Sequence, residues 1–124
     1  MYLLVFYMRI LITGATGFVG KHLVSSLSDK YDIRVLIRKS INYSENKNIE
    51  VVHGDLTNLS SLKNIAKKVN VVYHLASLRP DKVYSYKKYW DVNLKGTKNL
   101  LKVCKGKVDK FIFTSTVGKA FIQS

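Results

Sequence analysis

Three glycines spaced three residues apart, Gly14, Gly17 and Gly20, follow directly on an apolar run at residues 8–13. Residues 18–29 then place apolar side chains at helical spacing, so the glycines form a turn between a buried strand and a helix. In such a turn the first glycine permits a tight bend, the second lets a phosphate approach the backbone, and the third lets helix and strand pack closely. The free N–H groups at the helix start attract phosphates. The segment TGATGFVG therefore predicts a dinucleotide-binding unit, with a tight turn that binds nothing as the alternative.

The rest of the chain alternates apolar runs with amphipathic segments, as the first unit does. Because alternating strands and helices require right-handed crossovers, they predict a parallel sheet covered by helices. The near-continuous Val, Ile and Leu runs fit strands that are buried on both faces. We expect an α/β, Rossmann-like, doubly wound sheet of about five parallel strands in the order 3-2-1-4-5. The further strands are predicted at residues 32–38, 49–55, 70–76 and 109–115, and the further helices at 58–69 and, as one or two helices closed by Gly106, at 84–105.

The end of the second predicted strand concerns the choice of cofactor. An acidic residue about 20 residues after the glycine turn binds the ribose 2′-hydroxyl of NAD. Here the strand ends Ile37-Arg38-Lys39-Ser40, with two cations and no acid. Because cations favour a 2′-phosphate, we expect Arg38 and Lys39 to bind NADP, with NAD as the alternative. The other interpretation of Arg38 is a solvated cation at a strand end.

Composition and charge limit the partners and the compartment. One cysteine, Cys104, can build neither a disulfide framework nor a cysteine-based metal site, so we expect a buried thiol, no metal and a cytoplasmic location. Residues 63–124 hold 14 Lys/Arg against 3 Asp/Glu, which fits either a lysine-rich solvated face or a nucleic-acid partner. We favour the solvated face, because few aromatic residues interleave the lysines. The apolar start at residues 1–7 is too short to span a membrane.

Five segments, in order and at plausible spacing, resemble the extended short-chain dehydrogenase/reductase family, also called the NAD-dependent epimerase/dehydratase family. They are TGATGFVG (13–20), GDLT (54–57), HLAS (74–77), DVNLKGTKNLL (91–101) and FTST (113–116). The resemblance runs from Met8 to about Gly118. It implies an NAD(P)-binding Rossmann domain over residues 1–124, acting as a sugar-nucleotide epimerase or dehydratase or as a ketone/alcohol oxidoreductase.

The resemblance also implies a set of site residues. Thr116 matches the catalytic Ser/Thr of the family, and Asn93 takes a supporting role near the cofactor. Purely structural alternatives remain: Asp55 could cap a turn, Asn93 could bond its own helix backbone, and residues 114–116 could be ordinary β-branched strand residues. For His74 we expect an ordinary end-of-strand histidine. The residues implied to bind the cofactor are Gly14, Thr16, Gly17, Phe18, Val19 and Gly20 in the turn, Asp55 and Leu56 beside the adenine, Leu75, Ala76 and Ser77 beside the ribose and pyrophosphate, and Thr114 and Ser115 beside the nicotinamide.

One part of the family's machinery has no counterpart after Thr116. In the family, a Tyr followed four residues later by Lys supplies an acid or base, because the cation lowers the pKa of the phenol. The spacing occurs here at Tyr43…Lys47 and Tyr84…Lys88, both before Thr116, and we interpret both as chance matches. We therefore expect an incomplete cofactor half that lacks the substrate-binding C-terminal part and is inactive alone. A non-catalytic NADP(H)-binding or sensor module is one alternative, and a basic nucleic-acid-binding domain is another.

The fifth predicted strand also concerns association. In the order 3-2-1-4-5 this strand is the last of a sheet truncated before its further strands, so the segment KFIFT would expose unpaired backbone groups. We expect self-association through this edge, or pairing with a separate C-terminal chain.

Overall fold

Five parallel strands form the sheet. The computed structural model describes residues 8–38, 43, 49–78 and 83–114. The strand order is β3-β2-β1-β4-β5 and each neighbouring pair is parallel, which confirms the predicted fold class and order. The strands are β1 (Arg9–Thr13), β2 (Asp32–Ile37), β3 (Ile49–His53), β4 (Val71–His74) and β5 (Lys110–Phe113).

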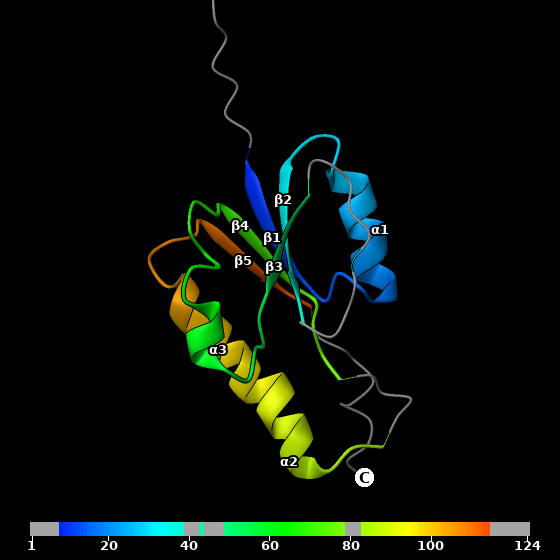
Figure 1. The fold of residues 1–124 in the computed structure, drawn as a ribbon, viewed down its shortest axis with the longest axis vertical. Helices are drawn as coiled ribbons and strands as arrows, with labels where there is room; N and C mark the ends of the chain where they lie inside the picture. The colour runs from blue at the N-terminus through cyan, green and yellow to red at the C-terminus, as the bar shows by residue number, and fades with distance from the viewer. Residues whose placement is uncertain (1–7, 39–42, 44–48, 79–82, 115–124) are drawn as a thin grey trace, which may run out of the picture.

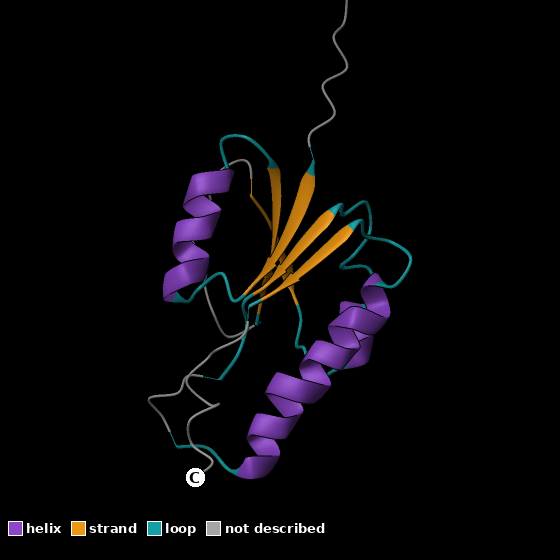
Figure 2. Cartoon of the chain, turned by 180° about the vertical axis from the view of Figure 1, so that it is seen from behind, coloured by secondary structure: helices purple, strands orange, loops and turns teal. Residues whose placement is uncertain are grey.

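Helices cover both faces of the sheet (Figures 1 and 2). The helical segments are α1 (Phe18–Leu27), η1 (Leu59–Leu62), α2 (Tyr86–Tyr89), η2 (Trp90–Lys95) and α3 (Gly96–Cys104). On one face, Val24 of α1 packs in a cluster with Ile10 and Ile12 of β1. Leu11 points to the other face, where it shares a second cluster with Leu100 of α3. The core is therefore two layers, one on each side of the sheet. The central strands β1 and β2 are buried on both faces, as the apolar runs predict, whereas the outer strands β3 and β5 are only partly buried.

The predicted helical segment 84–105 is one continuous run in which α2, η2 and α3 follow each other without a break, and η2 is a π-helical stretch. Ser85 caps its start, and the Ser85 hydroxyl accepts the backbone N–H of Lys88 at 3.2 Å. The run ends before Gly106, whose φ is +74°, the left-handed conformation typical after a helix C-terminus. No helix within the described residues is both long and apolar enough to cross a membrane.

The prediction of a helix over residues 58–69 is wrong for most of its length. The helical part is the short 3₁₀ segment η1, and turns follow it up to Lys68, whose φ is +59°. The backbone bonds here join residues three apart, as in the 3.1 Å bond from the Ile65 N–H to the Leu62 carbonyl. The apolar side chains still reach the core, since Leu62 and Ile65 are buried. An apolar pattern at helical spacing thus fits a chain of tight turns equally well.

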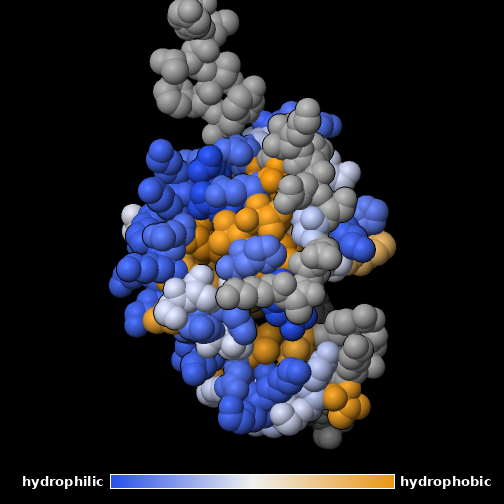
Figure 3. All heavy atoms as spheres, in the orientation of Figure 1, coloured by the Kyte–Doolittle hydropathy of each residue, from blue (hydrophilic) through white to orange (hydrophobic). Residues whose placement is uncertain are grey.

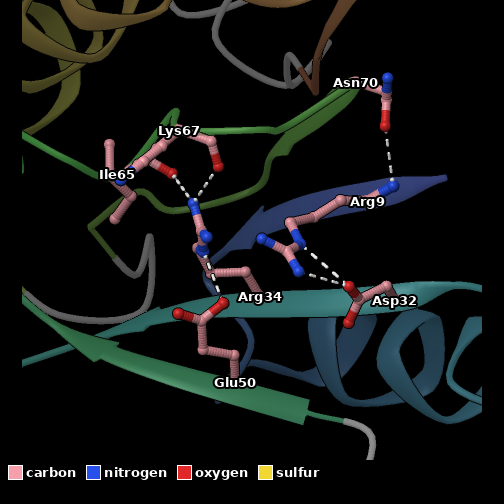
Figure 4. A network of polar contacts seen from close by, with 7 residues as sticks. All are labelled: Arg9, Asp32, Arg34, Glu50, Ile65, Lys67 and Asn70. Carbon is pink, nitrogen blue, oxygen red and sulfur yellow. Dashed lines mark hydrogen bonds and ion pairs between the residues drawn. The ribbon is translucent and has the colours of Figure 1, made fainter. Parts of the chain in front are cut away.

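Buried Arg34 on β2 contributes to this departure from a helix, because it takes two carbonyls in the second half of the segment (Figure 4). Its side chain is 6% exposed, and its Nη1 donates to the carbonyls of Ile65 at 2.7 Å and Lys67 at 2.9 Å. Its Nε donates to Glu50 at 2.9 Å, which pairs the charge. In an α-helix, these carbonyls would accept N–H groups four residues further on. A guanidinium from a distant strand takes their place.

Candidate functional site

The glycine turn lies at the carboxyl end of β1, beside the segment that follows β4. Gly14 has a φ of +75°, and a Cβ there would lie 2.7 Å from the backbone nitrogen of Ala76. A Cβ at Gly20 would lie 2.0 Å from the carbonyl oxygen of Gly14. The first glycine therefore bends the chain against the segment after β4, and Gly20 lets α1 close on the turn. Figure 1 shows that α1 begins at the carboxyl end of the strands, the end to which their arrows point.

Gly17 is different, because protein packing gives no reason for a glycine at this position. Among the described atoms, a Cβ would meet the Gly14 carbonyl oxygen alone, at 3.4 Å, which is an ordinary contact. Its φ of −76° suits any residue. The backbone at Gly17 is therefore bare beside a helix start, and this is the surface that a pyrophosphate requires. The residues present fit the dinucleotide that the sequence predicts.

The first turn of α1 leaves its amide groups open to a ligand. Gly17 is the N-cap residue, no described side chain caps this end, and the first turn contains no acidic residue. The first N–H groups of a helix have no acceptor within the helix, and they carry a partial positive charge. Thr16, Phe18 and Val19 are exposed here, and Phe18 is 81% exposed. An anionic group can therefore approach this end directly.

A buried histidine links β1, β4 and α3. His74 is 1% exposed; its Nδ1 lies 2.6 Å from Thr13 Oγ1 and its Nε2 lies 2.8 Å from Thr97 Oγ1. Burial lowers the pKa of His74 to about 4, so the ring is neutral at neutral pH. The Thr13 carbonyl also accepts the N–H of Leu75 at 3.2 Å. His74 therefore bonds side chains of β1 and α3, although we expected an ordinary end-of-strand histidine. The available signal was a polar residue in each of two neighbouring strands, Thr13 at the end of the first and His74 near the end of the predicted strand 70–76.

Residues 75–78, which follow β4, are held in place by their backbone. The Ala76 N–H donates to Thr13 Oγ1 at 3.2 Å, and the Leu78 N–H donates to Asn93 Oδ1 at 3.0 Å. Asn93 therefore supports the segment after β4, and its amide oxygen does not bond its own helix backbone. Ser77 is exposed, and its N–H has no partner among the described residues. The segment thus forms a fixed wall next to Gly14, with one backbone donor left over.

Arg38, Asp55 and Leu56 lie after the carboxyl ends of β2 and β3. Arg38 is exposed directly after β2. Asp55 Oδ1 accepts the Thr57 N–H at 2.9 Å and the Thr57 hydroxyl at 2.8 Å. The carboxylate therefore caps a turn, which is the structural alternative given for Asp55 in the sequence analysis. Leu56 is buried, and its carbonyl accepts the side-chain amide of Asn99 at 2.8 Å. These residues border the same end of the sheet as the glycine turn.

The remaining predicted residues lie outside the described part of the chain or away from the glycine turn. Three of them lie outside the described part of the chain: Lys39, Ser115 and Thr116. Thr114 is exposed after β5 and donates its N–H to the His74 carbonyl at 3.3 Å. Lys47 of one Tyr…Lys spacing also lies outside, whereas the Nζ of Lys88 lies 5.0 Å from the ring centroid of Tyr84. That second pair is a cation on an aromatic ring at the start of α2.

Cys104 lies in the core at the end of α3, as expected for a buried thiol. Burial raises its pKa to about 11, although Lys107 acts in the opposite direction. The thiol is therefore protonated and unreactive at neutral pH. Within the described ranges, no three His, Cys, Asp or Glu side chains are grouped so that they could hold a metal ion.

A doubly wound parallel sheet, with a glycine turn and an uncapped helix start at its carboxyl end, defines a Rossmann-type nucleotide-binding domain. Comparison with known families narrows this class. Residues 10–120 match the sequence model of the NAD dependent epimerase/dehydratase family, and the chain belongs to this family. The resemblance carried by the five sequence segments is thereby confirmed, and family membership supports binding of a nicotinamide dinucleotide.

Relatives of known activity cover nearly the whole chain. The dTDP-D-glucose 4,6-dehydratase of Dictyostelium discoideum is 32% identical over 127 residues, covering 90% of this chain and 29% of that protein. The UDP-glucose 4-epimerase of Pisum sativum is also 32% identical over 127 residues, covering 87% of this chain and 36% of that protein. A solved short-chain dehydrogenase/reductase superfamily protein of Agrobacterium tumefaciens, with bound NAD, has a TM-score of 0.72 at 26% identity, covering 87% of this chain and 32% of that chain. The chain therefore spans 29% to 36% of the length of these relatives.

Proposed function

We propose that this chain binds NADP(H) as the dinucleotide-binding part of an extended short-chain dehydrogenase/reductase. The observation that carries the proposal is Gly17, whose bare backbone beside an uncapped helix start has no explanation in protein packing. Gly14 and Gly20 hold the turn around it, and Ala76 lies on the opposite wall. A nicotinamide cofactor would supply hydride transfer, while the residues of this chain bind and orient the dinucleotide.

The proposed reaction class is that of a sugar-nucleotide epimerase or dehydratase, or of a ketone/alcohol oxidoreductase. The two relatives named above support the epimerase or dehydratase class, since the name of each includes a nucleotide-linked glucose. Thr116 is the proposed catalytic hydroxyl, two residues after Thr114 at the end of β5. We propose that these 124 residues supply dinucleotide binding to that reaction. A dinucleotide sensor is the alternative role for the same site.

Arg38 supports NADP over NAD. It is exposed directly after β2, where an acid would bind the 2′-hydroxyl of NAD. We expect fluorescence titrations of the purified chain to show tighter binding of NADPH than of NADH, by roughly 10- to 150-fold, because the guanidinium bonds the 2′-phosphate. Arg38→Asp should reverse the preference, since a carboxylate accepts the 2′-hydroxyl and repels the phosphate.

A matched control for this charge reversal is Lys30→Asp, at an exposed cation before β2, at the opposite end of the sheet. It should leave both affinities unchanged. Equal affinity of the unaltered chain for NADPH and NADH would overturn the NADP preference. Failure of both nucleotides to bind would overturn the proposed function itself.

The basic half of the chain supports a solvated face over a nucleic-acid site. Lys95, Lys98, Lys102 and Lys105 lie along the exposed side of α3 and the residues next to it, with no aromatic residue between them. Figure 3 shows hydrophilic residues along the border of the molecule on the side where α3 lies. The chain's one cysteine supports a reducing compartment such as the cytoplasm as the proposed location.

The edge of β5 is a proposed surface for self-association. Within the described sheet, β5 pairs with β4 alone; Phe111 and Ile112 are half-buried and Phe113 is 53% exposed. Because unpaired edges with apolar side chains recruit other strands, sedimentation velocity should show a mass that rises with concentration. Ile112→Lys should suppress this rise, because a charge blunts a strand edge, whereas Lys110→Arg should not. A constant monomer mass for the unaltered chain would contradict the proposal.

A further inference from the structure

We propose that Thr13, His74 and Thr97 are positioning residues, which form one directed chain of hydrogen bonds that orients residues 75–78 to receive the dinucleotide. The inference rests on the proposed function, because it concerns the wall of the same site. It assigns a role to the ring of His74, which neither the glycine turn nor the resemblance requires. The juxtaposition is built from β1, β4 and α3, three elements that meet at the carboxyl end of the sheet.

The direction of the chain follows from hydrogen-bond chemistry. The Thr97 hydroxyl donates its single hydrogen to the Asn93 carbonyl at 2.8 Å, so toward His74 it can only accept. His74 Nε2 therefore carries the ring hydrogen, and Nδ1 of the neutral ring is an acceptor. The Thr13 hydroxyl donates to that Nδ1, and its lone pair accepts the Ala76 N–H at 3.2 Å. One arrangement of hydrogens satisfies every member.

Core packing alone does not explain these side chains. Thr13 is 0% exposed and His74 is 1% exposed, and apolar residues of similar size would fill the same space without any need for partners. The polar groups are instead completely matched, since no buried side-chain nitrogen or oxygen within the described ranges lacks a hydrogen-bond partner. Such a network specifies one geometry, because any other orientation leaves a buried polar atom unpaired.

The geometry that the chain specifies concerns the backbone next to the glycine turn. The Ala76 N–H points back to Thr13, and the Leu78 N–H is taken by Asn93, which also supplies the terminal carbonyl of the chain. The N–H of Ser77, between them, has no partner among the described residues. The network therefore occupies the neighbouring donors and leaves the Ser77 N–H, among the described residues, as the backbone donor available to a ligand.

The test has two parts, and the first uses the unaltered chain. Nitrogen NMR of imidazole-labelled protein at neutral pH should show His74 as the single tautomer with hydrogen on Nε2, coupled to a slowly exchanging Ala76 amide. The opposite tautomer, or a mixture, would overturn the directed chain whether or not a dinucleotide binds. This measurement needs no substitution, so a folding defect cannot obscure it.

The second part compares matched variants in NADPH titrations. Thr97→Val keeps the shape but removes the acceptor, so we expect NADPH affinity to fall roughly tenfold and Ala76 exchange to accelerate. Thr97→Ser restores the hydroxyl and should restore both readouts, which a merely structural loss would not do. Unchanged affinity and exchange in Thr97→Val would overturn the positioning role while the proposed function stands. If the unaltered chain does not bind NADPH, the proposed function and this role both fail.

Discussion

A chain with Gly20→Ala is expected to lose on the order of 3 kcal/mol of unfolding free energy, a large share of the total for a small domain. The added Cβ would lie 2.0 Å from the Gly14 carbonyl oxygen and 2.8 Å from the Ala15 Cα. Both neighbours are backbone atoms, so the clash is relieved only when α1 moves away from the turn. Urea unfolding followed by circular dichroism measures the loss.

Gly17→Ala is the matched control, because it adds the same methyl group three residues earlier. That Cβ meets the Gly14 carbonyl oxygen at an ordinary 3.4 Å, so stability should change by no more than about 1 kcal/mol. The methyl group would instead occupy the surface proposed for the pyrophosphate, and NADPH binding should fall by more than about tenfold. Equal stability of the two variants would contradict the packing argument. Undiminished binding by Gly17→Ala would contradict the site.

Acid should destabilise this chain through His74. Burial lowers the pKa of His74 from 6.5 to about 4 in the folded chain. Between these pH values the unfolded chain binds a proton at His74 that the folded chain does not. The contribution of His74 to the free energy of unfolding is therefore fully present above pH 6.5 and is lost as the pH decreases toward 4. The expected loss across this window is roughly 3 kcal/mol. Urea unfolding at a series of pH values measures it.

Among the described residues, no charged group lies against the ring to offset this effect. The groups against His74 are the hydroxyls of Thr13 and Thr97 and the rings of Phe111 and Phe113. Carboxylates also titrate at low pH, so the contribution of His74 is the difference between the unaltered chain and His74→Gln. A pH dependence unchanged by His74→Gln would refute the assignment.

The elements that were predictable from sequence are those whose cause is local. The strands are four to six residues long and rich in apolar side chains, which marks them in the sequence. The glycine turn marks the first crossover, because the φ of +75° at Gly14 and the approach of Gly20 to Gly14 and Ala15 are local constraints. The segment 58–69 was mispredicted as a helix because one of its partners is remote. Arg34 lies 31 residues before Ile65, and nothing in the segment itself shows that a guanidinium will take its carbonyls.

The same distinction separates the two sides of the candidate site. The side built by the glycine turn could be predicted from the sequence, because turn geometry and close packing explain Gly14 and Gly20. The side built by Thr13, His74 and Thr97 could not, since it depends on which hydroxyl donates and which accepts. The strand order places Thr13 beside His74, yet only coordinates show that Thr97 closes the chain from α3.

The pairing of β1 with β4 has a consequence for how the domain assembles. Thr13 and His74 are 61 residues apart in sequence, so their contact requires closure of a long loop, which slows folding. A nucleotide that contacts both the glycine turn and the segment after β4 binds only after this step is complete. At about 100 times its dissociation constant, such a ligand adds about 2.7 kcal/mol to the native state. A larger cellular supply of such a nucleotide would then raise the fraction of folded chains and lengthen their lifetime against proteolysis.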